Sequence, residues 1–176
     1  MSTQVDTRIE PPAQTSAVPL RFKAHNFAAH CYNTQSCSVI YDDHNFTRTY
    51  EDEPSGAPDA PDYKRRWGTA SYLGIGNFPP PAEVRWTSSD GVEHEAEVDI
   101  GDIFKNELIW HNVPKADMKD FYEGPVAGIP NIFLEVNDRT INAYMKMLIP
   151  TRTEQIPGNK YSYGRDDLFL AWSHTY

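Results

Sequence analysis

The chain has 176 residues, a length that suits one domain, and carries a formal net charge of −9. Apolar residues make up 39% of it and aromatic residues 12%, which is enough for a core and excludes a disordered chain. The acidic balance argues against nucleic acid and against anionic membrane surfaces, because phosphates require Lys and Arg. Compatible partners are cationic proteins, cations and neutral ligands, although the charge also simply favours solubility.

The N-terminal residues 1–17 are polar and contain proline. We expect them to form a flexible tail ahead of a single mainly β binding domain over residues 18–176. The tail has no apolar signal-peptide core, and no run in the chain approaches the ~20 apolar residues of a membrane-spanning helix. Such a start fits a cytosolic protein or a chain from which a signal has been removed.

Two cysteines, Cys31 and Cys37, lie between two segments of strand character. Apolar and polar residues alternate over 20–25, and residues 38–41 are rich in β-forming side chains. We predict a hairpin whose turn is closed by a Cys31–Cys37 disulfide, worth roughly 2–2.5 kcal/mol in the chain-entropy model. The alternative is two free thiols. A disulfide favours an oxidising compartment.

Seven carboxylates lie between Tyr41 and Tyr63, where Arg48 is the only firm positive charge. Prolines and a glycine exclude a regular helix or central strand from the second half of this acidic loop. We predict a surface loop that offers carboxylates and aromatic rings to a basic protein partner. The alternative is a solvated loop whose rings pack on a sheet. The predicted partner-binding residues are Asp42, Asp43, Phe46, Tyr50, Glu51, Asp52, Glu53, Asp59 and Asp62.

The rest of the chain alternates short strand patterns with turn residues. Strands are predicted over residues 71–76, 82–87, 92–99, 132–136, 141–149 and 168–172. Asp99 is placed to cap one short helix, and Asn112 and Pro114 to open a second that ends near Gly124. Strands follow strands without βαβ alternation. The predicted fold is therefore a mainly β, antiparallel, β-sandwich-like single domain with one or two short helices inserted.

No constellation of residues points to catalysis. His25 and His30 lie near the cysteines, but a disulfide removes both sulfur ligands from any metal site. There is no G-x-S-x-G motif, and prolines follow Gly74-Ile75-Gly76 where a phosphate-binding loop would need a helix. We expect no catalytic residues, no metal, no cofactor and no enzyme activity. A small hydrolase with its site scattered over loops is the alternative.

Scattered residues over roughly 82–176 form a recognisable pattern. They are Val84-Arg85-Trp86, Ser89-Asp90-Gly91, Val98 to Phe104, Leu134 to Ile141, Ile156 to Asn159 and Arg165 to Leu168. This pattern resembles a bacterial family of immunity proteins that neutralise type VI secretion lipase effectors. The resemblance offers no catalytic residues to carry over.

The resemblance implies a small periplasmic protein that binds and inhibits a cognate phospholipase effector. The expected mechanism is insertion of the acidic loop into the effector's cleft, where carboxylates stand in for the lipid phosphate. Members usually carry a secretion signal or lipoprotein cysteine, so membrane contact is expected only through a removed signal or lipid anchor. The alternative is a secreted β-sandwich that binds carbohydrate or protein without catalysis and exposes Trp67, Trp86 or Trp110 as a platform.

Overall fold

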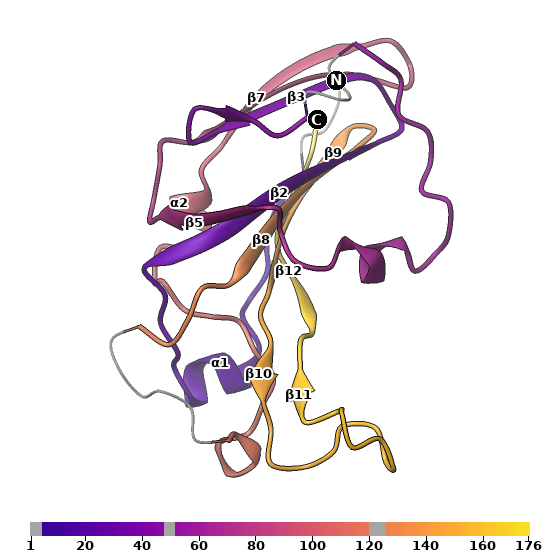
Figure 1. Ribbon diagram of the computed structural model, residues 1–176. Coiled ribbons are helices and arrows are strands. Elements are labelled where there is room, and N and C mark those ends of the chain that lie inside the picture. The colour runs from indigo at the N-terminus through magenta and orange to yellow at the C-terminus, as the bar shows by residue number, and fades with distance from the viewer. Residues whose placement is uncertain (1–4, 48–51, 120–125) are drawn as a thin grey trace.

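The computed structural model describes residues 5–47, 52–119 and 126–176, and its fold is mainly β with two packed sheets (Figure 1). The first sheet contains, in spatial order, β1 (Val5–Arg8), β12 (Leu168–Thr175), β9 (Thr140–Lys146), β8 (Asn131–Asn137), β2 (Ala24–Tyr32) and β5 (Tyr72–Gly76). The second contains β4 (His44–Asn45), β3 (Thr34–Tyr41), β6 (Ala82–Ser88) and β7 (Glu93–Val98). The predicted β-sandwich-like fold is confirmed.

Short elements connect and extend the sheets. They are α1 (Ala13–Ala17), α2 (Ile100–Ile103), the 3₁₀ turns η1 (Tyr63–Trp67) and η2 (Lys115–Asp117), and a small pair formed by β10 (Ile149–Pro150) and β11 (Gly164–Arg165). None of the helices in the described ranges is long and apolar enough to cross a membrane.

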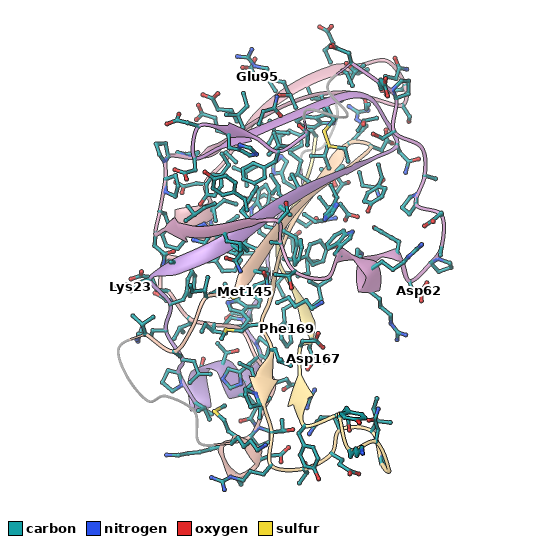
Figure 2. All side chains as sticks on the ribbon, viewed as in Figure 1. Lys23, Asp62, Glu95, Met145, Asp167 and Phe169 are labelled. Atoms are coloured by element: carbon teal, nitrogen blue, oxygen red, sulfur yellow. A yellow bond between two sulfur atoms is a disulfide. The ribbon has the colours of Figure 1, made fainter. Side chains whose placement is uncertain are left out.

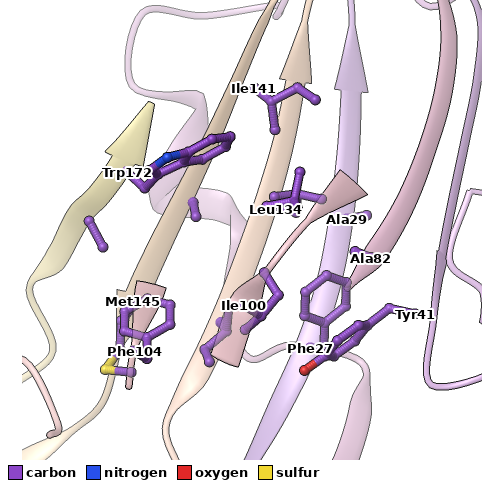
Figure 3. Close-up of a cluster of buried hydrophobic side chains, with 14 of the residues drawn as sticks. Phe27, Ala29, Tyr41, Ala82, Ile100, Phe104, Leu134, Ile141, Met145 and Trp172 are labelled. Carbon is purple, nitrogen blue, oxygen red and sulfur yellow. The ribbon is translucent and has the colours of Figure 1, made fainter. Parts of the chain in front are cut away.

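The main core lies between the two sheets. Phe27, Leu134 and Ile141 project from the six-stranded sheet, and Tyr41 and Ala82 come from the four-stranded sheet (Figure 3). Alternation along each strand places these side chains on the inner face. Strand β8 is buried along both faces over residues 132–136, because its outer side is covered as well.

Several predicted elements are confirmed. Strands β6 and β7 form a hairpin, as do β8 and β9, and β5 and β12 occupy their predicted segments. Asp99 caps α2, with its Oδ1 accepting a hydrogen bond from the Asp102 N–H at 3.0 Å. The predicted strand to Ile149 instead ends at Lys146, and Ile149 pairs with β11. Part of the second predicted helix is the turn η2, and residues 120–125 lie outside the described residues.

The prediction of a flexible tail over residues 1–17 is wrong for residues 5–17. Strand β1 pairs antiparallel with β12, and Arg8 forms an ion pair with Asp102. In α1, the buried Thr15 hydroxyl accepts from the His111 N–H at 3.0 Å and donates to its carbonyl at 3.1 Å. Polar composition concealed this order because an edge strand pairs through its backbone and leaves polar side chains in solvent.

The predicted hairpin around the cysteines is also wrong in its pairing. Strands β2 and β3 are consecutive, but they belong to different sheets, and β2 pairs with β8 in parallel. The predicted Cys31–Cys37 disulfide is present, and it therefore connects the two sheets where the chain crosses between them. Asn33, with φ of 54°, makes the sharp turn, since Asn tolerates the left-handed region.

Candidate binding surfaces

The middle of the acidic loop is attached to the disulfide turn. Thr34 and Ser55 exchange backbone hydrogen bonds of 3.2 and 2.7 Å, and the Asn33 N–H donates to the Gly56 carbonyl at 3.0 Å. Thr34 lies inside the ring that the Cys31–Cys37 bond closes. The disulfide turn thus fixes the loop three residues after Asp52.

The end of the acidic loop folds over the outer face of the six-stranded sheet. We call residues 57–70 the strap. The Trp67 ring stacks on His30 with ring centroids 4.7 Å apart, and its Nε1–H donates to the Tyr32 hydroxyl at 3.0 Å. The Lys146 ammonium donates to the Gly68 carbonyl at 3.3 Å. These contacts bury a second, smaller apolar cluster beneath the strap.

A buried carboxylate, Glu135, lies under the strap. Its side chain is 1% exposed and accepts hydrogen bonds from the hydroxyl of Tyr63 on the strap, from the Asn142 amide at 3.0 Å and from the Tyr144 hydroxyl at 3.3 Å. Burial and contact with Glu135 raise the pKa values of both tyrosines, which keeps them neutral donors. Burial also lowers the pKa of His30, and the nearby Glu135 charge only partly opposes this. Sequence patterns gave no sign of this cluster.

The predicted partner-binding residues are not gathered into one patch. Asp42 and Asp43, both with positive φ, form the exposed two-residue turn between β3 and β4. Asp52 and Glu53 are exposed at the opposite end of β3, whose seven residue steps from Thr34 to Tyr41 span roughly 23 Å. The carboxylates therefore form separate groups.

The remaining predicted residues have individual surroundings. Asp59 binds the Arg66 guanidinium, which lowers the pKa of that carboxyl. Asp62 is exposed on the strap, far from Glu95 (Figure 2). Phe46 is half-buried against Phe27, with ring centroids 4.7 Å apart, so its ring helps to hold β4 on the sheet. Its role as a partner anchor stays a prediction. Tyr50 and Glu51 lie outside the described residues.

A more continuous acidic surface lies on the outer side of the four-stranded sheet. We call it the acidic face. The pairing of β3, β6 and β7 aligns its side chains in three rows across the strands. The rows are Ser36–Thr87–Glu93, Ser38–Arg85–Glu95 and Ile40–Glu83–Glu97. Most of these residues line a shallow concavity of about 750 Å³. Figure 2 shows Glu95 pointing away from the body of the protein. The alternating glutamates of β7 were visible in the sequence as a polar strand face, but their neighbours on β6 were not.

The charges on the acidic face are unbalanced. Arg85 forms a 3.2 Å ion pair with Glu95, and both side chains remain largely exposed. Glu83 lies directly opposite Glu97 across the strands, and neither has an ion-pair partner among the described residues. Like charges directly opposite one another destabilise a sheet. Four glutamates and one arginine give the face a net charge of −3.

One Ser–His–Asp grouping occurs at the β6–β7 turn. The Ser88 hydroxyl donates to Asp90 and lies 2.9 Å from His94 Nε2. Ser88 is fully buried, and its single proton is directed to the carboxylate and away from the imidazole. A nucleophilic triad needs an exposed serine whose proton passes to histidine. This grouping stabilises a turn and does not activate a nucleophile.

The histidines considered as metal ligands have other contacts. His25 is buried, and its two ring nitrogens bond Asn77 at 2.7 Å and Tyr41 at 2.8 Å. Burial lowers the pKa of His25. Within the described residues, no three His, Cys, Asp or Glu side chains are grouped so that they could hold a metal. Comparison of the chain with protein-family models, curated proteins and solved structures finds no match.

Proposed function

We propose that this chain is a non-catalytic binding protein whose acidic face receives a basic surface of a partner protein. The observation that carries the proposal is the opposition of Glu83 and Glu97 on a concave sheet face that no described residue covers. The unpaired carboxylates cost stability in the free protein. A lysine or arginine from a partner, placed between them, removes that cost.

The acidic face is suited to rapid recognition of a cationic surface. Exposed carboxylates attract a basic partner over about one Debye length and suppress binding of acidic ones. Small side chains on β3, namely Ser36 and Ser38, leave room for a long cationic side chain to reach Glu83 or Glu95. The contribution to affinity comes from pairs that become desolvated in the complex.

The resemblance supplies the proposed partner, a phospholipase effector of the type VI secretion system that the chain inhibits. The disulfide is compatible with an oxidising compartment, and the periplasm is the proposed location. The proposed mechanism is occlusion of the effector's cleft. Of the two acidic elements, the acidic face has the more continuous carboxylate array, and Asp52 and Glu53 of the acidic loop are the second candidate contact.

The proposal is tested by recovering the partner from source cells with the tagged chain as bait. The recovered protein is then assayed for phospholipase activity with and without the chain. Wild-type protein is expected to inhibit, and the double variant E83K/E97K is expected to bind at least about 10-fold more weakly. The matched variant D52K/E53K reports on the acidic loop.

If only D52K/E53K binds the partner more weakly, the contact lies on the acidic loop and not on the acidic face. Unchanged binding by both variants would contradict an acidic contact altogether. If the recovered partner has no phospholipase activity, the chain is still a binding protein, but the assignment of its partner as a phospholipase effector is wrong.

The carbohydrate-binding alternative lacks a supporting surface. It requires an exposed aromatic platform, but Trp67, Trp86 and Trp110 are buried. No observation on the described residues favours it.

A further inference from the structure

A projecting arm lies at the end of the protein opposite the acidic face. It comprises residues 148–165 and includes β10 and β11 (Figure 1). The two strands pair through Ile149 with Arg165 and Pro150 with Gly164. In the figure the arm extends away from the two sheets, and residues 156–161 at its tip are all exposed.

The base of the arm is held by a network around Asp117 of η2. The Asp117 carboxylate accepts hydrogen bonds from the Thr153 N–H at 3.0 Å, the Thr153 hydroxyl at 2.8 Å and the Gln155 amide at 3.3 Å. The Asp117 carbonyl accepts from the Arg152 N–H at 2.7 Å. These bonds lower the pKa of Asp117 and fix the direction of the arm.

The tip of the arm is closed on itself. The Gln155 N–H donates to the Ser162 carbonyl at 2.8 Å, and the Ser162 hydroxyl donates to the Asn159 carbonyl at 2.7 Å. The Gly158 N–H donates to the Glu154 carboxylate at 3.0 Å. The tip is therefore pre-organised, which reduces the entropy lost when it binds.

The arm exposes large apolar side chains. Leu148 is 61% exposed, Ile156 60%, Tyr161 85% and Tyr163 40%. They are four of the nine exposed large apolar side chains in the described part of the protein, and they fall within 16 residues of sequence. Exposed apolar side chains gathered on one element make it a candidate interaction site.

Residues 148–165 carry three positive side chains and one carboxylate, a formal net charge of +2, whereas the whole chain carries −9. The ammonium of Lys160 lies 5.1 Å from the centre of the Tyr161 ring, and that of Lys119 lies 5.4 Å from the centre of the Tyr163 ring. The nearby carboxylates Asp117 and Glu154 accept the hydrogen bonds described above and keep their negative charges. The arm thus presents tyrosines and lysines together.

We propose that the arm docks on an anionic lipid bilayer, with Ile156 and Tyr161 inserted at the headgroup level. Tyrosine favours the membrane interface, where its ring is buried and its hydroxyl stays hydrated. Lysines near the surface are attracted to anionic headgroups. The acidic face lies at the end of the domain opposite the arm (Figure 1), so its carboxylates do not face the lipid.

This proposal does not depend on the proposed function. It also revises the expectation drawn from the net charge, which argued against anionic membranes. The net charge of −9 describes the whole chain, whereas docking depends on the charge of the surface that meets the lipid.

The test is sedimentation of the full chain with vesicles of phosphatidylglycerol and phosphatidylcholine, against vesicles of phosphatidylcholine alone. We expect binding to the anionic vesicles that falls at least 10-fold in I156S/Y161S and also falls in K119E/K160E. Leu73 is 67% exposed on β5, outside the arm, so L73S is the matched apolar control and is expected to bind as wild type. Lys105 is exposed in the turn after α2, outside the arm, so K105E is the matched charge control.

Each other result overturns the proposal. If the chain does not bind anionic vesicles, the proposal fails. It also fails if L73S and I156S/Y161S lose vesicle binding to the same extent. Equal binding to both vesicle types removes the role of charge. Concentration-dependent association without lipid that I156S/Y161S abolishes would assign the arm to a protein interface. The unfolding midpoint of each variant confirms that it is folded, and the E83K/E97K variant is expected to retain vesicle binding.

Discussion

The outer faces of the two sheets place carboxylates in opposite environments. On the six-stranded sheet, the strap covers Glu135, and three neutral donors satisfy it. On the four-stranded sheet none of the described residues covers the outer face, and Glu83 lies opposite Glu97 with no cation from the described residues between them. The first arrangement holds the fold together, and the second costs the fold stability.

The difference separates structural carboxylates from those available for binding. A buried carboxylate is tolerated only when hydrogen bonds replace its water, so Glu135 is committed to the strap. An exposed carboxylate beside another one keeps its water but is repelled by its neighbour, and a cation placed between the two relieves that repulsion. Acidic residues in a sequence therefore need their surroundings before they are assigned to a partner.

The largest expected effect is on Glu135. Replacing it with alanine leaves the Tyr63 and Tyr144 hydroxyls and the Asn142 amide without their acceptor, and we expect a loss of about 3 kcal/mol in the free energy of unfolding. Urea denaturation measures it. The control E95A, on the acidic face, is expected to change stability by less than about 0.5 kcal/mol. Similar losses in the two variants would remove the distinction between the faces.

The next effect is that of the disulfide, which connects the sheets that carry these two faces. The variant C31S/C37S is expected to lose roughly 2–2.5 kcal/mol of unfolding free energy, because the open chain gains entropy. Hydrogen exchange should also increase at Ser55 and Asn33, whose backbone N–H groups donate to the Thr34 and Gly56 carbonyls across the contact between the acidic loop and the disulfide turn. Protection at those two residues equal to wild type would show that the acidic loop is held independently of the disulfide.

A smaller effect concerns pH and the strap. Burial lowers the pKa of His30, so the closed strap holds a neutral imidazole, while the opened or unfolded chain binds a proton below its ordinary pKa of about 6.5. The stabilisation is complete above pH 6.5 and is lost as the pH falls from there toward the lowered pKa. The protection of residues 63–70 from hydrogen exchange, corrected for the intrinsic rate, is expected to fall as the pH is lowered from 7.5 to 5.5.

The control for this pH effect is His30→Gln, which removes the titrating group. Its exchange should vary less with pH after correction for the intrinsic rate. An unaltered pH dependence would show that another group controls the strap.

The sequence predicted the positions of strands and turns better than it predicted which strands pair with one another. Period-two alternation identified the β6–β7 and β8–β9 hairpins, because local turn residues set the register of adjacent strands. It failed for β2 and β3, since the choice between a hairpin and a crossing to the other sheet depends on distant strands. The parallel pairing of β2 with β8 joins segments about a hundred residues apart and has no local signal.

The same holds for the candidate surfaces: the sequence showed the residues but not how they are arranged in space. The sequence identified the carboxylates of the acidic loop but treated them as one group, whereas β3 separates Asp42 from Asp52. It also identified an acidic outer side on the strand that became β7. The opposition of Glu83 and Glu97 arises only from the pairing register, and the exposure of Tyr161 arises only from the position of the arm.

The smallest expected effect is on the acidic face itself. The variant E97Q removes one of two opposed charges and is expected to stabilise the free protein by about 0.2–1 kcal/mol, more at low salt than at high salt. E93Q, whose cross-strand neighbour is the uncharged Thr87, is the matched control and is expected to be nearly neutral. A gain in E97Q accompanied by weaker partner binding would show that the acidic face sacrifices stability for recognition. A loss of stability in E97Q would mean that Glu97 has a structural role, and the contrast with Glu135 would then fail.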